Sequence, residues 1–282
     1  MYSKSLPYML LLPATLFLCI FFIYPFTLVA WQAFTTDTGE FTSSFFQEMA
    51  SHWKFNTALI NTLLLALAVV PFQMALAIYM ATLVNGMKRG RDAVLYIWTI
   101  PLGISDLAAG LIWLAIFEQS GFLNSFLHTL GVVEQPVGFL GYENKGIIFL
   151  AIVLAEIWRA TSIVLVILVA GMGLIPKEYA EAAEVFGASR WQRFTRVTLP
   201  MLKPSLQTAM ILRVILAFEV FAVVVALGGT NLPVLMSEVF TWQYELRDAH
   251  VAAAYALVIL AISIAFTLLI MWALRVPKGA RV

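Results

Sequence analysis

Long apolar runs constrain this chain more than any other feature. A helix needs about 20 mostly apolar residues to cross the hydrocarbon layer of a membrane. Six runs meet that length, at about 8–31, 57–84, 93–117, 146–170, 205–227 and 251–274. Charged residues make up only 12% of the chain, whereas a water-soluble domain carries about a quarter. The sequence therefore predicts an all-α, multi-pass membrane protein with six transmembrane helices in a single domain, 1–282, and it excludes a soluble enzyme.

The basic residues predict how the chain is oriented in the membrane. The first apolar run, from Leu10 to Ala30, is too long for a signal peptide, so we expect it to stay in the mature chain. An even number of spans places both termini on one side. The basic residues on that side are Lys4, Lys88, Arg89, Arg91, Lys177, Arg190, Arg193, Arg196, Lys203, Arg275, Lys278 and Arg281, and those on the other side are Lys54, Lys145 and Arg247. Because cytoplasmic loops carry an excess of Lys and Arg, both termini are predicted to be cytoplasmic, as is the loop 171–204.

Five ionisable side chains fall inside the spans, and each must be shielded from lipid. They are Asp106, Glu156, Arg159, Arg213 and Glu219. Facing lipid would cost each of them about 2.5–3.5 kcal/mol, so we expect them to point into the bundle or a water-filled cavity. Glu156 and Arg159 are three residues apart on one helix and can pair with each other. Two roles stay open at every position: a transport pathway, or an internal contact that only holds helices together.

The cytoplasmic loop between the fourth and fifth spans has the pattern of a helix, a turn and a second helix. Pro176 suits the first turn of a helix, and Gly187 supplies a permissive break at its end. Ser189 and Gln192 form a capping box for a second short helix, which Pro200 is expected to end. The segment 176–200 is therefore predicted to form a helix–turn–helix unit beneath the membrane.

The first of these short helices has an apolar stripe suited to docking. Tyr179, Ala183 and Phe186 lie at positions i, i+4 and i+7, on one helix face. A short helix with small residues in its middle can slide into a groove on another protein. The segment reads Glu181-Ala-Ala-x-x-x-Gly187-Ala188, followed by Phe194 and Leu199-Pro200. It resembles the EAA loop of the membrane subunits of ATP-binding-cassette (ABC) importers.

Further motifs extend this resemblance along nearly the whole chain. They are Phe22-Ile-Tyr-Pro25, Asn61-Thr-Leu63, Arg89-Gly-Arg91, Gly110-Leu-Ile-Trp113 and Glu156-Ile-Trp158-Arg159. Together they are similar to the binding-protein-dependent sugar-permease branch, which includes maltose, trehalose and glycerol-3-phosphate permease subunits. The resemblance implies a type I ABC importer permease fold and a place in the inner (cytoplasmic) membrane of a prokaryotic cell.

The resemblance also implies a coupling role for the loop 176–200. In that family this loop is the coupling helix, which sits in a cleft of a separate ATPase. The residues implied to contact the ATPase are Glu178, Glu181, Ala182, Ala183, Phe186, Gly187 and Ala188. ATP and Mg2+ are implied in that ATPase, and no cofactor is expected in this chain. None of its lysines follows a glycine, so a phosphate-binding Gly-Lys-Ser/Thr loop is absent.

The partners and the substrate also follow from the resemblance. It implies a heterodimer with a second, homologous permease, two ATPase subunits, and an extracytoplasmic binding protein facing the loops 118–145 and 228–250. A sugar needs aromatic platforms with a few hydrogen-bonding groups along its path. The predicted substrate pathway comprises Glu156, Trp158, Arg159, Arg213, Phe218, Glu219, Phe221 and Tyr255. The sequence departs from the branch after the fifth span, where Gly228-Gly-Thr-Asn231 replaces Gly-Gly-Gly-Pro, so the particular sugar does not carry over.

The sequence also bears on four other classes of function. An ion-coupled secondary transporter is the alternative, with Asp106, Glu156 and Glu219 as proton or sodium sites, and it would work without an ATPase. Nucleic acid is not an expected partner, because the net charge is only +1 and no long basic run exists. The three histidines are scattered and none has a second ligand at metal spacing, so no metal site is predicted. No nucleophile–base constellation indicates a membrane-embedded enzyme.

Overall fold

The described part of the chain is helical, as the sequence predicts. The computed structural model describes residues 6–275, and among these the only strand-like feature is an isolated bridge between Thr35 and Phe41. Lys4, Lys278 and Arg281, which entered the charge count, lie outside the described residues. The chain divides into two compact units: Met1–Asn56 with Leu235–Leu260 (unit 1), and Thr57–Val234 with Ala261–Val282 (unit 2).

Unit 1 begins with a long apolar helical run. Its span Tyr8–Phe34 has a mean hydropathy of 2.2, and 0% of that window is buried within the chain. A π-helical turn interrupts the run just before Pro25, which has no backbone N–H to donate. The elements of unit 1 are α1 (Leu6–Leu18), η1 (Cys19–Ile23), α2 (Tyr24–Phe34), α3 (Ser44–Ser51), α14 (Leu235–Phe240), η5 (Thr241–Glu245) and the first part of α15 (Ala249–Ala273).

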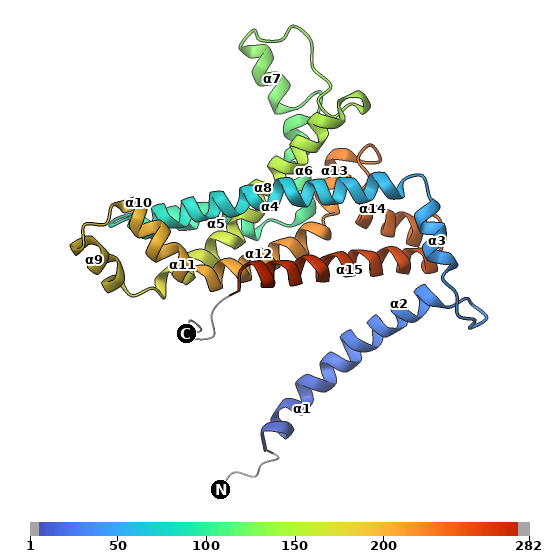
Figure 1. The fold of residues 1–282 in the computed structure, drawn as a ribbon. Helices are drawn as coiled ribbons and strands as arrows, with labels where there is room; N and C mark the ends of the chain where they lie inside the picture. The colour runs from blue at the N-terminus through green and yellow to red at the C-terminus, as the bar shows by residue number, and fades with distance from the viewer. Residues whose placement is uncertain (1–5, 276–282) are drawn as a thin grey trace. The chain divides into compact units, whose positions relative to one another are not determined.

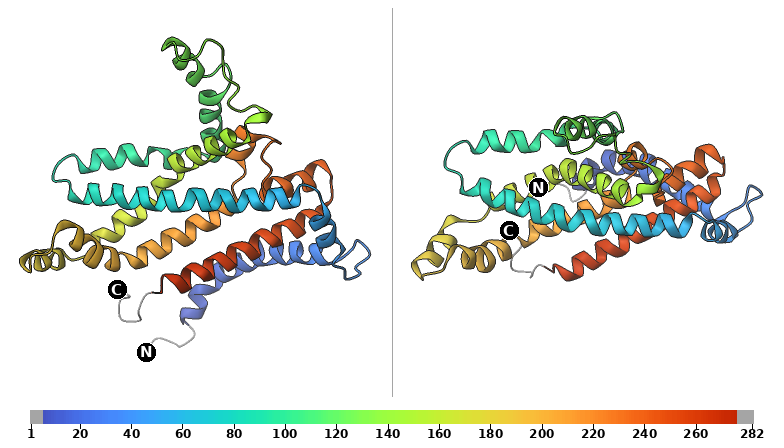
Figure 2. Two further views of the ribbon diagram at one scale, coloured as in Figure 1. Left: turned by 45° about the horizontal axis from the view of Figure 1, so that its top comes forward. Right: turned by 90° about the horizontal axis from the view of Figure 1, so that it is seen from above.

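Unit 2 holds the remaining helices and most of the core. Its elements are α4 (Phe55–Gly86), which starts at the end of unit 1, then α5 (Arg91–Thr99), η2 (Ile100–Gly103), α6 (Asp106–Phe117), α7 (Phe122–Thr129), η3 (Tyr142–Asn144), α8 (Lys145–Gly173), α9 (Lys177–Val185), α10 (Arg190–Arg193), η4 (Phe194–Thr198), α11 (Leu199–Met201), α12 (Lys203–Phe218) and α13 (Ala222–Gly228). The long helix α8 extends for about 43 Å at 1.5 Å per residue. In Figure 1 and Figure 2, α7 lies near one end of α8, and α9 to α11 lie at the other.

Two of the six predicted spans are not continuous helices. The run 93–117 is divided into α5, the 3-10 helix η2 around Pro101, and α6, whose first turn is capped by the Ser105 hydroxyl. The run 205–227 is interrupted between Phe218 and Ala222. Within residues 6–275, five helices are long and apolar enough to cross a membrane, and there are up to six if one bent helix pair counts as a span.

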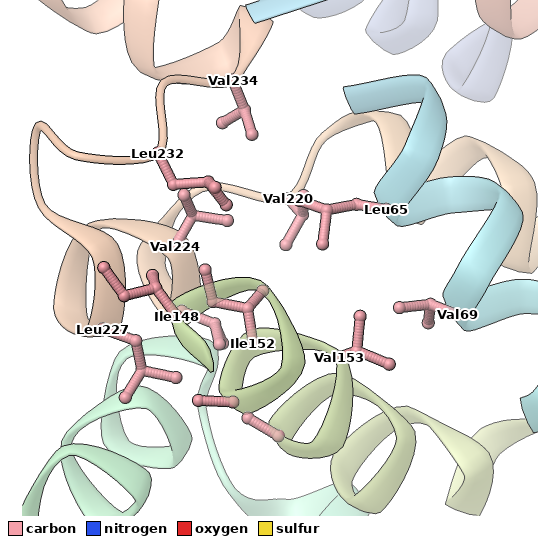
Figure 3. Packing of buried hydrophobic residues seen from close by; sticks show 13 residues of the cluster. Leu65, Val69, Ile148, Ile152, Val153, Val220, Val224, Leu227, Leu232 and Val234 are labelled. Atoms are coloured by element: carbon pink, nitrogen blue, oxygen red, sulfur yellow. The ribbon is translucent and has the colours of Figure 1, made fainter. Parts of the chain in front are cut away.

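Close helix contacts in unit 2 depend on small residues. The core joins α4, α8 and α13 through branched aliphatic side chains, among them Leu65, Ile152 and Val224 (Figure 3). At Gly171 of α8, an added Cβ would lie 2.6 Å from the Ser205 Cβ of α12. Because side chains cannot approach this closely, the glycine is required where α8 crosses α12, as is typical of membrane helix pairs.

Candidate functional site

The helix–turn–helix unit forms as expected at the end of α8. Pro176 stands one residue before α9, at the N-cap, so the expectation that it lies in the first turn is off by one residue. The helix ends at Val185 with Phe186 as its C-cap. Gly187 follows with a φ of +81°, the left-handed conformation that glycine adopts at least cost. Two backbone bonds close the end, Gly187 N–H to the Glu184 carbonyl and Ala188 N–H to the Ala183 carbonyl, each 2.9 Å long. This is a Schellman motif, which fixes the turn after α9.

The second short helix is tied to the first. Ser189 and Gln192 form the predicted capping box: Ser189 N–H donates to Gln192 Oε1 at 2.8 Å, and Gln192 N–H donates to Ser189 Oγ at 3.3 Å. An ion pair between Glu184 and Arg193 joins α9 to α10. The expectation that Pro200 ends this helix is wrong. The π-helical turn η4 precedes Pro200 and leads into α11, so the helix continues to Met201 before it bends by 67° into α12.

The residues predicted to contact an ATPase form an open surface. Phe186 is 89% exposed, Val185 is 85% exposed and Tyr179 is 55% exposed. Glu178, Glu181 and Ala182 are also exposed, while Ala183 and Ala188 are half-buried. Contiguous exposed apolar side chains at the end of a helix, rimmed by acids, mark a site for contact with another molecule.

Inside the membrane-spanning part of unit 2, four of the five ionisable residues form a connected cluster. Arg159 of α8 pairs with Asp106 of α6 at 2.7 Å and with Glu156 of its own helix at 3.4 Å, so the predicted pairing of Glu156 with Arg159 is confirmed. Glu156 Oε2 lies 3.4 Å from the Arg213 guanidinium of α12. The cluster therefore neutralises Glu156 and Arg213 where both are buried, which lowers the cost of burial.

Gln73 belongs to this cluster and was missed in the sequence. Its amide oxygen accepts a hydrogen bond from Arg213 Nε at 2.6 Å, and its amide nitrogen donates to the Glu156 backbone carbonyl at 2.6 Å. Gln73 is completely buried, and its contacts join α4 to α8 and α12. The signal in the sequence is an uncharged amide in the middle of the apolar run 57–84, where a polar side chain needs a hydrogen-bond partner.

A small cavity lies beside the cluster. It has a volume of about 10 Å³ and is lined by Glu156 and Arg213 together with Leu65, Val69, Ile152, Ala217 and Val220. That volume is enough for about one water molecule. One guanidinium nitrogen of Arg213, Nη1, is buried without a hydrogen-bond partner, so a water there would have a group to bind. A sugar cannot occupy this space.

The other residues of the predicted pathway are dispersed. Trp158 is 36% exposed and meets Trp113 edge to face, with ring centroids 6.2 Å apart. Phe218 is buried against Phe266. Phe221 stands in the break before α13, where Glu219 is exposed. Of the three acids of the ion-coupled alternative, Asp106 and Glu156 share Arg159 as a partner, whereas Glu219 is exposed at the break.

Tyr255 belongs to a different part of the chain from the rest of the predicted pathway. It lies in unit 1, where it is completely buried and meets Phe55 edge to face at 5.8 Å. Glu238, nearby in this unit, is 2% exposed, and its Oε2 lies 3.9 Å from His52 Nδ1. Burial raises the pKa of Glu238 above its usual value, while Lys54 and His52 act in the opposite direction. Within residues 6–275, no group of three His, Cys, Asp or Glu side chains is arranged to hold a metal ion.

The fold and this arrangement define a multi-pass helical membrane protein with an exposed helix–turn–helix unit, α9–α10, at one end of the long helix α8. Residues 73–276 match the family model described as "binding-protein-dependent transport system inner membrane component". The chain belongs to this family. The match includes α8 to α12, and hence the α9–α10 unit and the buried charge cluster.

Relatives and solved structures agree with this assignment. The chain is 28% identical to the trehalose/maltose transport system permease protein MalF of Thermococcus litoralis, over 94% of this chain and 92% of that protein. It is 29% identical to the sulfoquinovosyl glycerol transport system permease protein SmoG of Agrobacterium fabrum, over 94% and 89%. The fold is similar to a chain of a bacterial ABC transporter involved in the import of the acidic polysaccharide alginate, with a TM-score of 0.84, 24% identity and coverage of 97% and 96%.

Proposed function

We propose that this chain is a permease subunit of an ATP-driven sugar importer and that α9 transmits the action of a separate ATPase to the membrane helices. The single observation that carries the proposal is the exposed, acid-rimmed apolar surface of α9, held by the Schellman motif and the capping box. A surface with this geometry fits a cleft on a partner protein. Family membership supports the proposal, because the family consists of membrane components of binding-protein-dependent transport systems.

The local structure suggests how force on α9 would reach the membrane. The unit α9–α10 is braced internally by the Glu184–Arg193 ion pair, so it can move as one piece. It connects directly to α8 on one side and, through the bend before α12, to α12 on the other. Those two helices carry Glu156 and Arg213. A displacement of α9 would therefore change the spacing of the helices that hold the buried charges.

The proposed substrate is a sugar, and its pathway runs beside the charge cluster. Relatives named for trehalose, maltose and sulfoquinovosyl glycerol transport support a sugar or sugar-like solute. The cavity of about 10 Å³ means that α4, α8 and α12 must separate before a sugar can pass. Separation would expose Glu156, Arg159 and Arg213 as hydrogen-bonding groups, with Trp158, Phe218 and Phe221 as apolar platforms. Glu219 would add a polar group at the break between α12 and α13.

The partners follow from this function. A second, homologous permease completes the pathway, two ATPase subunits bind ATP with Mg2+, and an extracytoplasmic binding protein delivers the solute. The complex resides in the inner membrane of a prokaryotic cell, with both termini and α9 in the cytoplasm. A solved alginate transporter of similar fold, with a TM-score of 0.80, forms a complex with an alginate pentasaccharide-bound periplasmic protein, which supports the last partner.

Substitutions in the unit α9–α10, which we call the docking unit, test the proposal. Glu181→Arg reverses a charge on the exposed surface, and Gly187→Val places a branched side chain at a φ of +81°, a conformation that costs a non-glycine residue roughly 1–2 kcal/mol. Both variants should reach the membrane but lose sugar uptake in proteoliposomes that contain the ATPase. Gly187→Asn is the matched control, because asparagine tolerates the left-handed conformation. Uptake at the wild-type rate by Glu181→Arg and Gly187→Val would refute the coupling role.

A further inference from the structure

An open groove lies between α4 and the second helix of the docking unit. One wall is a stripe of α4 at positions i, i+3, i+4 and i+7, formed by Ala75, Ile78, Tyr79 and Thr82. The other wall is formed by Arg190, Trp191 and Phe194 of α10 and η4. The groove has a volume of about 410 Å³, within the range of about 300–1,000 Å³ typical of small-ligand sites. All seven residues belong to unit 2.

The walls of the groove are amphipathic. Tyr79 is 62% exposed and Trp191 is 71% exposed, and aromatic residues of these two types are enriched where hydrocarbon meets water. The Thr82 hydroxyl is already satisfied by the Ile78 carbonyl at 2.7 Å. The groove therefore offers hydrocarbon-like walls along α4 and very little unmet hydrogen-bonding capacity on that side.

Arg190 supplies a positive charge to the groove. Arg193 is paired with Glu184, whereas Arg190 lines the groove and forms no ion pair within residues 6–275. Lys88 and Arg89 follow the end of α4 and are exposed. In Figure 1 and Figure 2 this turn lies at the same end of unit 2 as α10. An occupant with an apolar tail and an anionic head would match both the apolar α4 wall and the charge of Arg190.

We propose that this groove is a binding site for an anionic phospholipid, with an acyl chain along the α4 wall and the phosphate beside Arg190. A guanidinium suits a phosphate, since its planar donors can bind two phosphate oxygens at once. Basic pockets between membrane helices on the cytoplasmic side are a known type of site for anionic head groups. The cytoplasmic placement of the groove rests on the proposed function. The site links a membrane lipid to the segment that precedes α12, so its occupancy would stabilise the docking unit against α4.

A bound lipid is distinguished from ordinary bilayer lipid by head-group selectivity. Lipid that merely covers an apolar face exchanges without preference, whereas a site lined by Arg190 retains an anionic head in preference to a zwitterionic one. A helix of the second permease is a different occupant. It would exclude lipid from the groove and would make Tyr79 and Trp191 cross-link to protein.

The experiment is native mass spectrometry of the purified complex after equilibration with equal amounts of phosphatidylglycerol and phosphatidylcholine. The wild type should retain phosphatidylglycerol at least threefold more than phosphatidylcholine, and Arg190→Gln should abolish this preference. Arg89→Gln is the matched control, because it removes the same charge at the same end of unit 2 without touching the groove, and it should keep the preference. The variant Tyr79→Ala should lower the retention of both lipids.

Other outcomes overturn the proposal. Equal retention of the two lipids by the wild type would mean that only bulk bilayer lipid covers this face. Loss of preference in Arg89→Gln as well as Arg190→Gln would mean a diffuse charge effect without a site. Cross-linking of Trp191 to a partner permease, without retained lipid, would assign the groove to protein. Lipid retention and cross-linking do not involve ATP hydrolysis. They therefore test the lipid site independently of the coupling role of α9.

Discussion

Arg159 and Asp106 form an ion pair of 2.7 Å between α8 and α6. The Asp106 side chain is 51% exposed, whereas that of Arg159 is 18% exposed. Asp106 is also the first residue of α6, where a negative charge is favoured by the helix dipole. Arg159 thereby connects an acid at an accessible helix end with Glu156, which is buried. The pair is the outermost link of a chain of charges that ends at Arg213.

A charge swap tests this link. Arg159→Asp should reduce sugar uptake at least tenfold, because it brings three acids together: Asp106, the buried Glu156 and the new aspartate. The double variant Arg159→Asp/Asp106→Arg restores an opposite pair between α8 and α6, so it should recover part of the lost uptake, and the recovery measures the coupling of the two residues. Uptake is measured in proteoliposomes with the partner subunits. No recovery in the double variant would show that the two residues do not act as a pair.

The buried end of the cluster predicts a stability effect. Arg213→Met leaves Glu156 with Arg159 alone and removes the partner of Gln73, so the variant should lose up to about 3 kcal/mol of stability. The loss can be followed by denaturant unfolding in detergent, through tryptophan fluorescence. Adding Glu156→Gln removes the uncompensated charge and should recover much of the loss. If Arg213→Met alone were as stable as the wild type, the prediction would be contradicted, and water would have to hydrogen-bond to Glu156 and Gln73 in place of the arginine.

The helix–turn–helix unit α9–α10 was more predictable from sequence than the charge cluster. Gly187, Ser189 and Gln192 act within a few residues of each other, so local rules of helix capping predicted the turn correctly. Pro200 misled because a π-helical turn accommodates it. The contact of Gln73 with Arg213 spans 140 residues, and no local pattern encodes such a pair.

The same limit explains the interrupted spans. By its apolar length, the run 93–117 is long enough to cross a membrane. Hydropathy, however, carries no information on whether the backbone of the run forms one continuous helix. Pro101 and the Ser105 cap divide that run into separate helices. The break between Phe218 and Ala222 has no proline at all, and tertiary packing of α13 against α6 and α8 accompanies it. Packing of this kind is not visible in a single sequence.

The close contact of α8 with α12 at Gly171 predicts that a larger side chain there lowers the stability of the protein. Gly171→Val would force atoms into the space of Ser205, where even a Cβ would be 2.6 Å from the Ser205 Cβ, and overpacking of this kind costs about 1–3 kcal/mol. Gly146→Val on the same helix is the control, because a Cβ there meets nothing within 4 Å. Thermal unfolding should show a lower midpoint for Gly171→Val only. Equal midpoints for the two variants would contradict the close crossing of α8 and α12.

Glu238 predicts a dependence of stability on pH. Because burial raises its pKa in the folded protein, the folded state favours the protonated acid. This contribution is complete below the usual pKa near 4.5 and is lost as the pH rises through the raised value. Glu238→Gln mimics the protonated acid, so its gain in melting temperature over the wild type should be larger at pH 8 than at pH 5. A gain that does not change with pH would exclude titration of Glu238.

Contact between α9 and an ATPase is the central claim, and cysteine cross-linking tests it most directly. Cys19, the single natural cysteine, is first replaced by serine, and Ala182→Cys is introduced on the exposed face of α9. The importer complex in membranes is then treated with a short reagent that has a thiol-reactive group at one end and a photoreactive group at the other, so that the ATPase needs no cysteine. The account predicts a product that joins this chain to the ATPase and that forms to a different extent with and without ATP. The control Thr129→Cys, at the end of α7, should give no such product. Failure of Ala182→Cys to cross-link to any ATPase, in a complex that still transports sugar, would contradict the account.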